Sequence, residues 1–133
     1  MLTGIEILPL LQNVRSFRNE PRTKEIRNDA IEEMVSIIGH GLFEWMRKSL
    51  RRNELRDEVA KFFIFKDEDD NEFMAEVVSE ALVRYGTRKE VDLHQMRVDL
   101  STNLSLSRYA GMSGVKNAAR FLSGDKSAFK RAA

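Results

Sequence analysis

Apolar residues recur every three to four positions along most of this chain, which is the spacing of one face of an α-helix. The longest such stretch runs from Thr23 to about Leu50. Its apolar positions are Ile26, Ala30, Met34, Ile37, Ile38, Leu42 and Trp45. Gly39 and Gly41 flank His40 within this stretch, and they predict either a close helix crossing there or a break into two helices.

Capping residues predict where the shorter helices begin. Thr3 and Glu6 have the spacing of a capping box, and Pro9 then either kinks this first helix or starts a new one. Asn53 is expected to cap a helix that continues through residues 55–63. The first half of the chain is therefore expected to be helical throughout.

An acidic run, residues 66–72, is expected to form a loop because it is too charged to lie in a core. Asp70 or Asn71 would cap the next helix, which would end at Gly86. A second capping box, Thr87 to Glu90, would open the helix after it.

Residues 61–78 also allow a β-hairpin. The runs FFIF and FMAEVV, on either side of the acidic residues, are rich in phenylalanine, isoleucine and valine, which favour strands. The spacing of four apolar residues favours a helix instead. These residues are Phe73, Val77, Ala81 and Tyr85.

Four consecutive bulky residues, Phe62, Phe63, Ile64 and Phe65, cannot all face inward from one helix. Two explanations stay open. At least one of them reaches a second surface, where a partner protein or another subunit would contact it, or the helix is buried on two sides.

These patterns predict an all-α protein, a single compact domain of residues 1–133 with about six helices and a C-terminal helix-turn-helix-like pair. Its 42% of apolar and 32% of charged residues are the balance of a folded, soluble chain. The absence of cysteine excludes disulfides and is compatible with the cytoplasm, where we expect the protein. The apolar start LTGIEILPLL contains an acid and is interrupted by Pro9, so neither a signal peptide nor a membrane span is expected.

The sequence lacks the motifs of catalytic, cofactor-binding and metal sites, so no enzyme, no cofactor and no metal are expected. His40 and His94 are the only histidines, and neither has the spacing of a zinc site. In a calcium loop that began at Asp67, Glu72 would replace the required glycine and Val78 the required glutamate.

Charge is distributed unevenly along the chain. Residues 103–133 carry six basic residues and one acidic residue, a net charge of +5, whereas residues 1–102 carry a net charge of −4. A basic C-terminal segment on an acidic helical body suggests a polyanionic partner, with the body left for dimerisation or a partner protein. A solvated tail is the alternative.

The basic segment has the pattern of two short helices joined by a bend. Ser101 and Thr102 would cap the first helix, Gly111 would supply a left-handed residue at the bend, and Ser113 would cap the second helix. Gly124 would end it. The apolar stripe of this second helix is Val115, Ala118, Ala119 and Leu122.

The opposite face of that helix is polar and basic, as a recognition helix requires. Asparagine can bond adenine and arginine can bond guanine in the major groove, while basic residues nearby contact phosphates. Lys116, Asn117 and Arg120 would therefore read bases, beside Ser113. The expected phosphate contacts are Lys126, Lys130 and Arg131.

The run YAGMS, followed by a short helix ending in RFLSG, resembles the helix-turn-helix of Lac-repressor-type bacterial regulators over residues 104–124. In that family an A-G-[VM]-S turn introduces the recognition helix, so the resemblance implies a turn at residues 109–113. The family places a β-branched apolar residue where this chain has Asn117. The recognition helix would therefore be rotated, or the turn altered by one residue.

We expect a small DNA-binding protein, a transcriptional regulator of bacterial or phage type that binds as a homodimer. The alternative is a non-catalytic interaction or assembly protein, such as a phage structural component or an inhibitor of a host enzyme. DNA binding that weakens steeply with salt would favour the first function, and no binding at low salt would favour the second.

Overall fold

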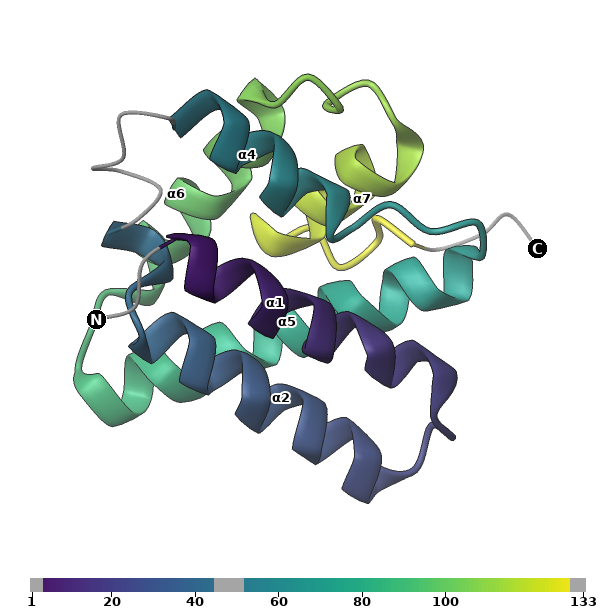
Figure 1. The fold of residues 1–133 in the computed structure, drawn as a ribbon, viewed down its shortest axis with the longest axis vertical. Helices are drawn as coiled ribbons and strands as arrows, with labels where there is room; N and C mark the ends of the chain where they lie inside the picture. Colours follow the sequence, from purple (N-terminus) through teal and green to yellow (C-terminus); the bar gives the residue numbers. More distant parts are fainter. Residues whose placement is uncertain (1–3, 45–51, 130–133) are drawn as a thin grey trace.

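The computed structural model of the protein describes residues 4–44 and 52–129, and these residues form helices and connecting turns without any strand. The elements are α1 (Gly4–Ser16), the 3-10 helix η1 (Phe17–Asn19), α2 (Lys24–Gly39), α4 (Arg52–Lys61), α5 (Glu68–Lys89), α6 (Leu93–Leu106) and α7 (Ser113–Leu122). Figure 1 shows them in a compact arrangement, so the predicted all-α fold is confirmed. Within the described ranges, no helix combines the length and the apolar character needed to cross a membrane.

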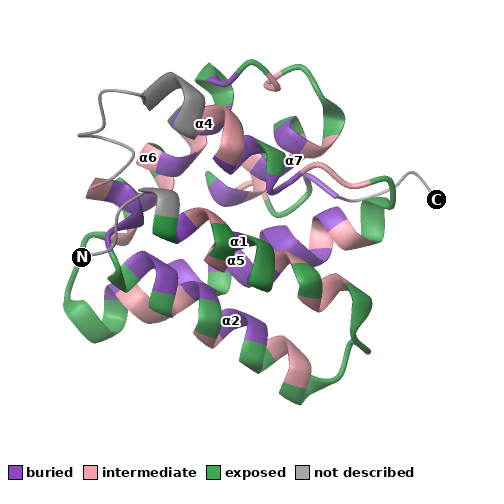
Figure 2. Cartoon of the chain, viewed as in Figure 1, coloured by how far each residue is buried: buried purple, intermediate pink, exposed green. Residues whose placement is uncertain are grey.

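Helix α5 is the centre of the fold. It packs against α2, α6 and α7, while α1 packs on α2 and α4 packs on α6. Figure 2 shows the buried positions of α2 and α5 turned toward the middle of the molecule and the exposed positions turned to solvent. The buried apolar residues of α5 include Phe73, Met74, Val77, Val78, Ala81 and Leu82. Because α7 lies on both α5 and α6, its position is fixed by the core.

The long helix expected from Thr23 to about Leu50 ends earlier. Thr23 caps α2 by accepting a hydrogen bond from the N–H of Ile26 at 3.1 Å, and the helix stops at Gly39. Gly41 follows with a φ of 100°, a left-handed conformation that ends a helix and that glycine adopts freely. Of the two alternatives, the structure therefore shows a break of the helix at the glycines. Trp45 and Leu50 lie outside the described residues.

Pro9 lies inside α1, so no new helix begins there. Thr3 of the first capping box lies outside the described residues. Asn53 lies within α4, which already begins at Arg52, so the expected cap is wrong by at least one residue. Single capping residues place a helix end only approximately because neighbouring side chains compete for the same role.

The acidic run is the start of α5 and not a loop. Asp67 caps the helix by accepting from the N–H of Asp69 at 2.9 Å, so the caps expected at Asp70 or Asn71 are wrong. Acidic residues in a first helical turn are stabilised by the positive end of the helix dipole, which is why a charged run forms helix here.

The far end of α5 also differs from the prediction. The helix continues past Gly86 to Lys89 and ends at Glu90, whose φ of 55° is left-handed. The capping box expected from Thr87 to Glu90 is therefore wrong. A Cβ at Gly86 would lie 3.2 Å from the carbonyl oxygen of Val91, so this glycine allows a close approach and does not end the helix.

Residues 61–78 do not form a hairpin. Helix α4 ends at Lys61, a short linker follows, and α5 begins at Glu68. Within the linker, Phe62 and Phe63 are buried and pack edge to face, with ring centroids 5.0 Å apart. These two phenylalanines therefore belong to the core and do not contribute to a partner surface.

The other two bulky residues are also covered from within the chain. Ile64 and Phe65 are half-buried and pack against the core. The guanidinium groups of Arg15 and Arg18 lie 4.4 and 5.8 Å from the centre of the Phe65 ring. The bulky residues are therefore covered mainly by their own chain, as the explanation of a helix buried on two sides expected. They lie in a linker, however, and not in a helix.

Candidate nucleic-acid interface

Helix α6 forms the first half of the candidate site. It is one continuous helix whose cap is Asp92, which accepts from the N–H of Gln95 at 3.2 Å. Ser101 and Thr102 lie in its middle, so the cap expected there is wrong. Ser101 instead donates its hydroxyl to the carbonyl oxygen of Ala119 at 3.1 Å, which joins α6 to α7.

The turn between α6 and α7 covers residues 107–112. Hydrogen bonds from the Ala110 and Met112 amides, 3.2 and 3.0 Å long, carry the chain around it. Gly111 does not adopt a left-handed conformation, so the role expected for it is wrong. The cap of α7 is Met112, and Ser113 is already the first helical residue, so Ser113 is not the cap either.

The inner side of α7 is the predicted apolar stripe. Val115, Ala118 and Leu122 are buried, and Ala119 is half-buried against α6. This side anchors the helix to the core. Opposite side chains on the same helix must therefore face away from the core.

Gly114 fixes how closely α7 approaches the rest of the molecule. A Cβ at this position would lie 2.7 Å from the carbonyl oxygen of Phe63, too close for any side chain. The same carbonyl accepts a hydrogen bond from Nδ2 of Asn71 at 2.9 Å. The start of α7 therefore rests directly on the linker between α4 and α5.

Four of the expected DNA contacts share one side of α7, which we call the outer face: Ser113, Lys116, Asn117 and Arg120. Ser113, Lys116 and Arg120 are exposed, and Asn117 is half-buried. At 100° per residue these four positions lie opposite the buried stripe. The structure thus brings these side chains together on a fixed helix, as the sequence predicted.

Arg120 is engaged by an acid from the segment that follows α7. Its Nε and Nη2 donate to Oδ2 of Asp125 at 3.1 and 2.7 Å. Oδ1 of Asp125 accepts from the N–H of Ser127 at 2.9 Å. The hydrogen bonds from Ser127 and then from Arg120 lower the pKa of Asp125 to about 2, so its carboxylate is charged at neutral pH.

Of the remaining expected contacts, only Lys126 lies within the described residues. Lys126 lies with its ammonium group 5.4 Å from the centre of the Phe121 ring, on a flank of α7. It lines a groove together with residues of α2 and α5. Lys130 and Arg131 lie outside the described residues.

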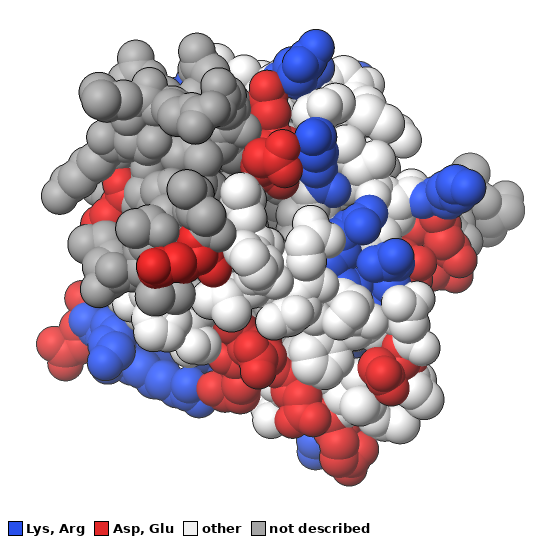
Figure 3. All heavy atoms as spheres, in the orientation of Figure 1, with Lys and Arg blue, Asp and Glu red and all other residues white. Residues whose placement is uncertain are grey.

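A basic and aromatic cluster beside the turn was not predicted. The Nζ of Lys61 and the guanidinium carbon of Arg108 each lie 5.8 Å from the centre of the Tyr109 ring. Figure 3 shows Lys and Arg side chains beside acidic ones over α4, and acidic side chains over α2. Lys61 and Tyr109 are far apart in the sequence, so only the packing of α4 on α6 reveals the cluster.

Comparisons with known proteins do not place this chain in a family. No protein-family model matches it, and neither a curated protein nor a solved structure matches it. The functional argument therefore rests on α6, α7 and the residues around them.

Proposed function

We propose that the protein binds DNA through the outer face of α7. The observation that carries this proposal is that Ser113, Lys116, Asn117 and Arg120 share one solvent-facing side of a helix whose other side is buried in the core. A helix fits the major groove, where asparagine and arginine can make paired hydrogen bonds to base edges. Because the helix is held by α5 and α6, these side chains would meet DNA without a folding cost.

The turn before α7 would supply phosphate contacts. The side chain of Met112 forms no capping hydrogen bond, so the first amides of α7 have no side-chain acceptor from their cap. Phosphate oxygens accept hydrogen bonds from such amides. The exposed side chain of Arg108 lies in the same turn and would add a positive charge.

DNA binding must also accommodate the ion pair between Arg120 and Asp125. Both side chains are partly exposed, and exposed ion pairs of this kind are weak. A guanine edge or a phosphate could therefore replace the carboxylate as the acceptor. Asp125 would then act against binding, because its negative charge lies at the edge of the DNA surface.

We further propose a homodimer that acts in the cytoplasm as a transcriptional regulator of bacterial or phage type. Val98 and Leu106 of α6 are 41% and 58% exposed, and their spacing of eight residues places them on one side of the helix. A second copy packed on this side would bury both residues. Dimers of this kind place two recognition helices on two half-sites, which raises affinity.

The same exposed residues also favour a second candidate function. An apolar strip on α6 is suited to another protein, as in a non-catalytic interaction or assembly protein such as a phage structural component or an inhibitor of a host enzyme. In that case the basic outer face would bind no DNA. The experiment below separates the two functions.

The test is fluorescence anisotropy of a labelled mixed-sequence duplex, titrated with protein at several salt concentrations. We expect binding near 50 mM salt that weakens steeply toward 200 mM, with a slope that falls by about 0.9 for each phosphate contact removed. Lys116→Ala should weaken binding, and Arg120→Ala should also reduce any preference among sequences. Lys89→Ala is the control, because Lys89 is exposed at the end of α5, on a different helix.

Two results would overturn the proposal. One is no binding at the lowest salt concentration, which would favour the protein-interaction function. The other is that Lys116→Ala and Lys89→Ala reduce the affinity for the duplex equally. That result would show that the duplex responds to the total positive charge of the protein and does not bind at the outer face.

A further inference from the structure

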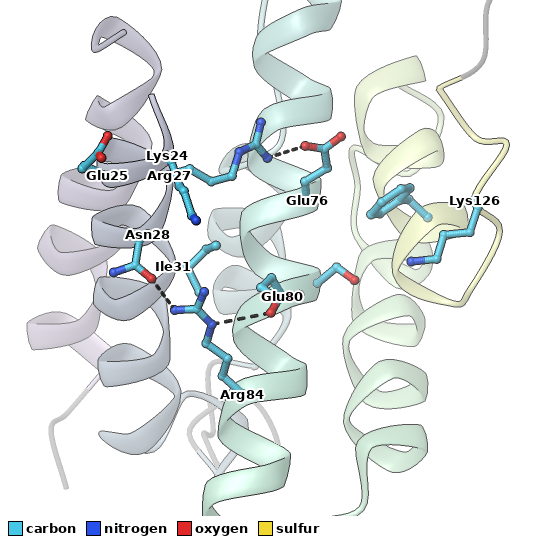
Figure 4. Close-up of a pocket in the computed structure, with 11 residues that line it drawn as sticks. Lys24, Glu25, Arg27, Asn28, Ile31, Glu76, Glu80, Arg84 and Lys126 are labelled. Carbon is cyan, nitrogen blue, oxygen red and sulfur yellow. Dashed lines mark hydrogen bonds and ion pairs between the residues drawn. The ribbon is translucent and has the colours of Figure 1, made fainter. Parts of the chain in front are cut away.

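A second site lies between α2 and α5, away from the outer face of α7. It is a groove of about 670 Å³ that is also lined by Phe121 of α7 and by Lys126 in the segment after it. Figure 4 shows Lys126 on the other side of α5 from α2. That volume is typical of sites for small ligands. The side chains that line the groove determine which kind of ligand it can bind.

Most charges in the walls are already neutralised. Nη1 of Arg27 on α2 pairs with Oε2 of Glu76 on α5 at 2.6 Å. Arg84 lies 3.5 Å from Glu80 and donates to Oδ1 of Asn28 at 2.8 Å, as Figure 4 shows. These pairs span the groove or line it, and they leave little net charge of their own.

Two lysines remain without an acidic partner in the described part of the chain. Lys24 lies at the edge of α2 toward α5, and Lys126 extends from the C-terminal segment back toward α5 (Figure 4). Glu25, the neighbouring acid on α2, also lines the groove but points away from α5 in the same view. The groove therefore has an excess of positive charge from two separate segments.

The lining of the groove combines apolar surface with a hydroxyl group. Ile31 and Phe121 supply the apolar part. Ser79 also lines the groove and is only 7% exposed. Its hydroxyl can donate a hydrogen bond to a ligand that enters the groove.

We propose that the groove binds a small anion that carries an aromatic or other apolar group. The ammonium groups of Lys24 and Lys126 would attract the anionic group, and the apolar part would lie on Ile31 and Phe121. The Ser79 hydroxyl would donate a hydrogen bond to it.

The probe for the test is 8-anilinonaphthalene-1-sulfonate, an aromatic anion whose fluorescence rises on binding. We expect saturable binding of one equivalent to the folded protein, weakened roughly tenfold by Lys126→Glu and by Lys24→Glu because each replaces an attracting cation by a repelling anion. Circular dichroism of each variant confirms that it is folded. The uncharged analogue N-phenyl-1-naphthylamine should bind more weakly than the anion and should not respond to these substitutions.

Lys116→Glu is the matched control, since it makes the same charge change on the outer face of α7. It should leave the binding of the probe unchanged while it weakens DNA binding, so the two proposals can fail separately. Equal probe affinity in the wild type and Lys126→Glu would overturn the groove proposal. Displacement of the probe by a DNA duplex would also overturn it, because the groove would then belong to the DNA surface.

Discussion

Arg120 donates two hydrogen bonds, of 3.1 and 2.7 Å, to a single carboxylate oxygen of Asp125. This pair joins the proposed recognition helix to the segment that follows it. Ser127 holds the other carboxylate oxygen, so Asp125 is fixed in place and Arg120 is fixed with it. An exposed guanidinium of the proposed DNA surface is thus partly neutralised in the free protein.

Replacing Asp125 by asparagine should strengthen DNA binding. The substitution removes a negative charge beside the DNA surface and frees the Arg120 side chain, so we expect the dissociation constant to fall by about two- to fivefold. Fluorescence anisotropy at one salt concentration measures the effect. Asp29→Asn makes the same charge change at an exposed position of α2 and should have little effect. Equal gains in the two variants would contradict the role given to Asp125.

Glu32 should account for part of the loss of stability in acid. It accepts hydrogen bonds from Arg88 and Arg84, which link α2 to α5 and lower its pKa from 4.5 to about 2. Its contribution is therefore present above its ordinary pKa and is lost as the pH falls from about 4.5 toward 2. In Glu32→Gln the melting temperature should be lower at pH 7 and should fall less between pH 5 and pH 2.

Glu33→Gln is the control for that measurement, because Glu33 is exposed on the same helix. Its melting temperature should follow the wild-type pH dependence. The role of Glu32 is contradicted if the Glu32→Gln curve runs parallel to the wild-type curve over the whole range.

Two glycines near α7 should respond in opposite ways to alanine. Gly114→Ala places a Cβ 2.7 Å from the backbone oxygen of Phe63, so we expect a loss of about 1–3 kcal/mol in the free energy of unfolding. Gly111→Ala meets nothing within 4 Å and should be neutral or gain up to about 1 kcal/mol. Urea denaturation of both variants measures the difference, and a tolerated Gly114→Ala would mean that α7 does not rest on the linker as described.

The proposed dimer should depend on the exposed side of α6. Leu106→Asp puts a charge on the most exposed large apolar residue described and should shift the protein from dimer to monomer in light scattering after gel filtration. Val91→Asp is the control, since Val91 is equally apolar, 41% exposed and outside α6. A wild-type protein that is already monomeric at micromolar concentration would refute the dimer.

The elements of the fold could be predicted from sequence, but several of their ends could not. Periodic apolar residues predicted the all-helical class correctly, because burial of one helical face requires that spacing. Helix ends depend on competition among nearby caps. Asp67 and Asp92 cap helices where Asp70 and Thr87 had been expected, and both aspartate and threonine are favourable at a cap.

Only the part of the candidate site that lies on a single helix could be predicted from the sequence. The outer face of α7 follows from the positions of Lys116 and Arg120 relative to the buried stripe, which helical geometry alone fixes. The pairing of Arg120 with Asp125 and the place of Lys126 depend on how the chain turns after α7. The groove depends on residues far apart in the sequence, so no local pattern predicts it.

The most direct test of the central proposal is the location of DNA on the folded protein. Amide chemical shifts of isotope-labelled protein, recorded by NMR during titration with a short duplex, report which residues DNA contacts. We expect the largest changes at Ser113, Lys116, Asn117 and Arg120, with smaller ones in the turn before α7. Changes confined to α2, or no change at low salt, would contradict DNA binding by the outer face of α7.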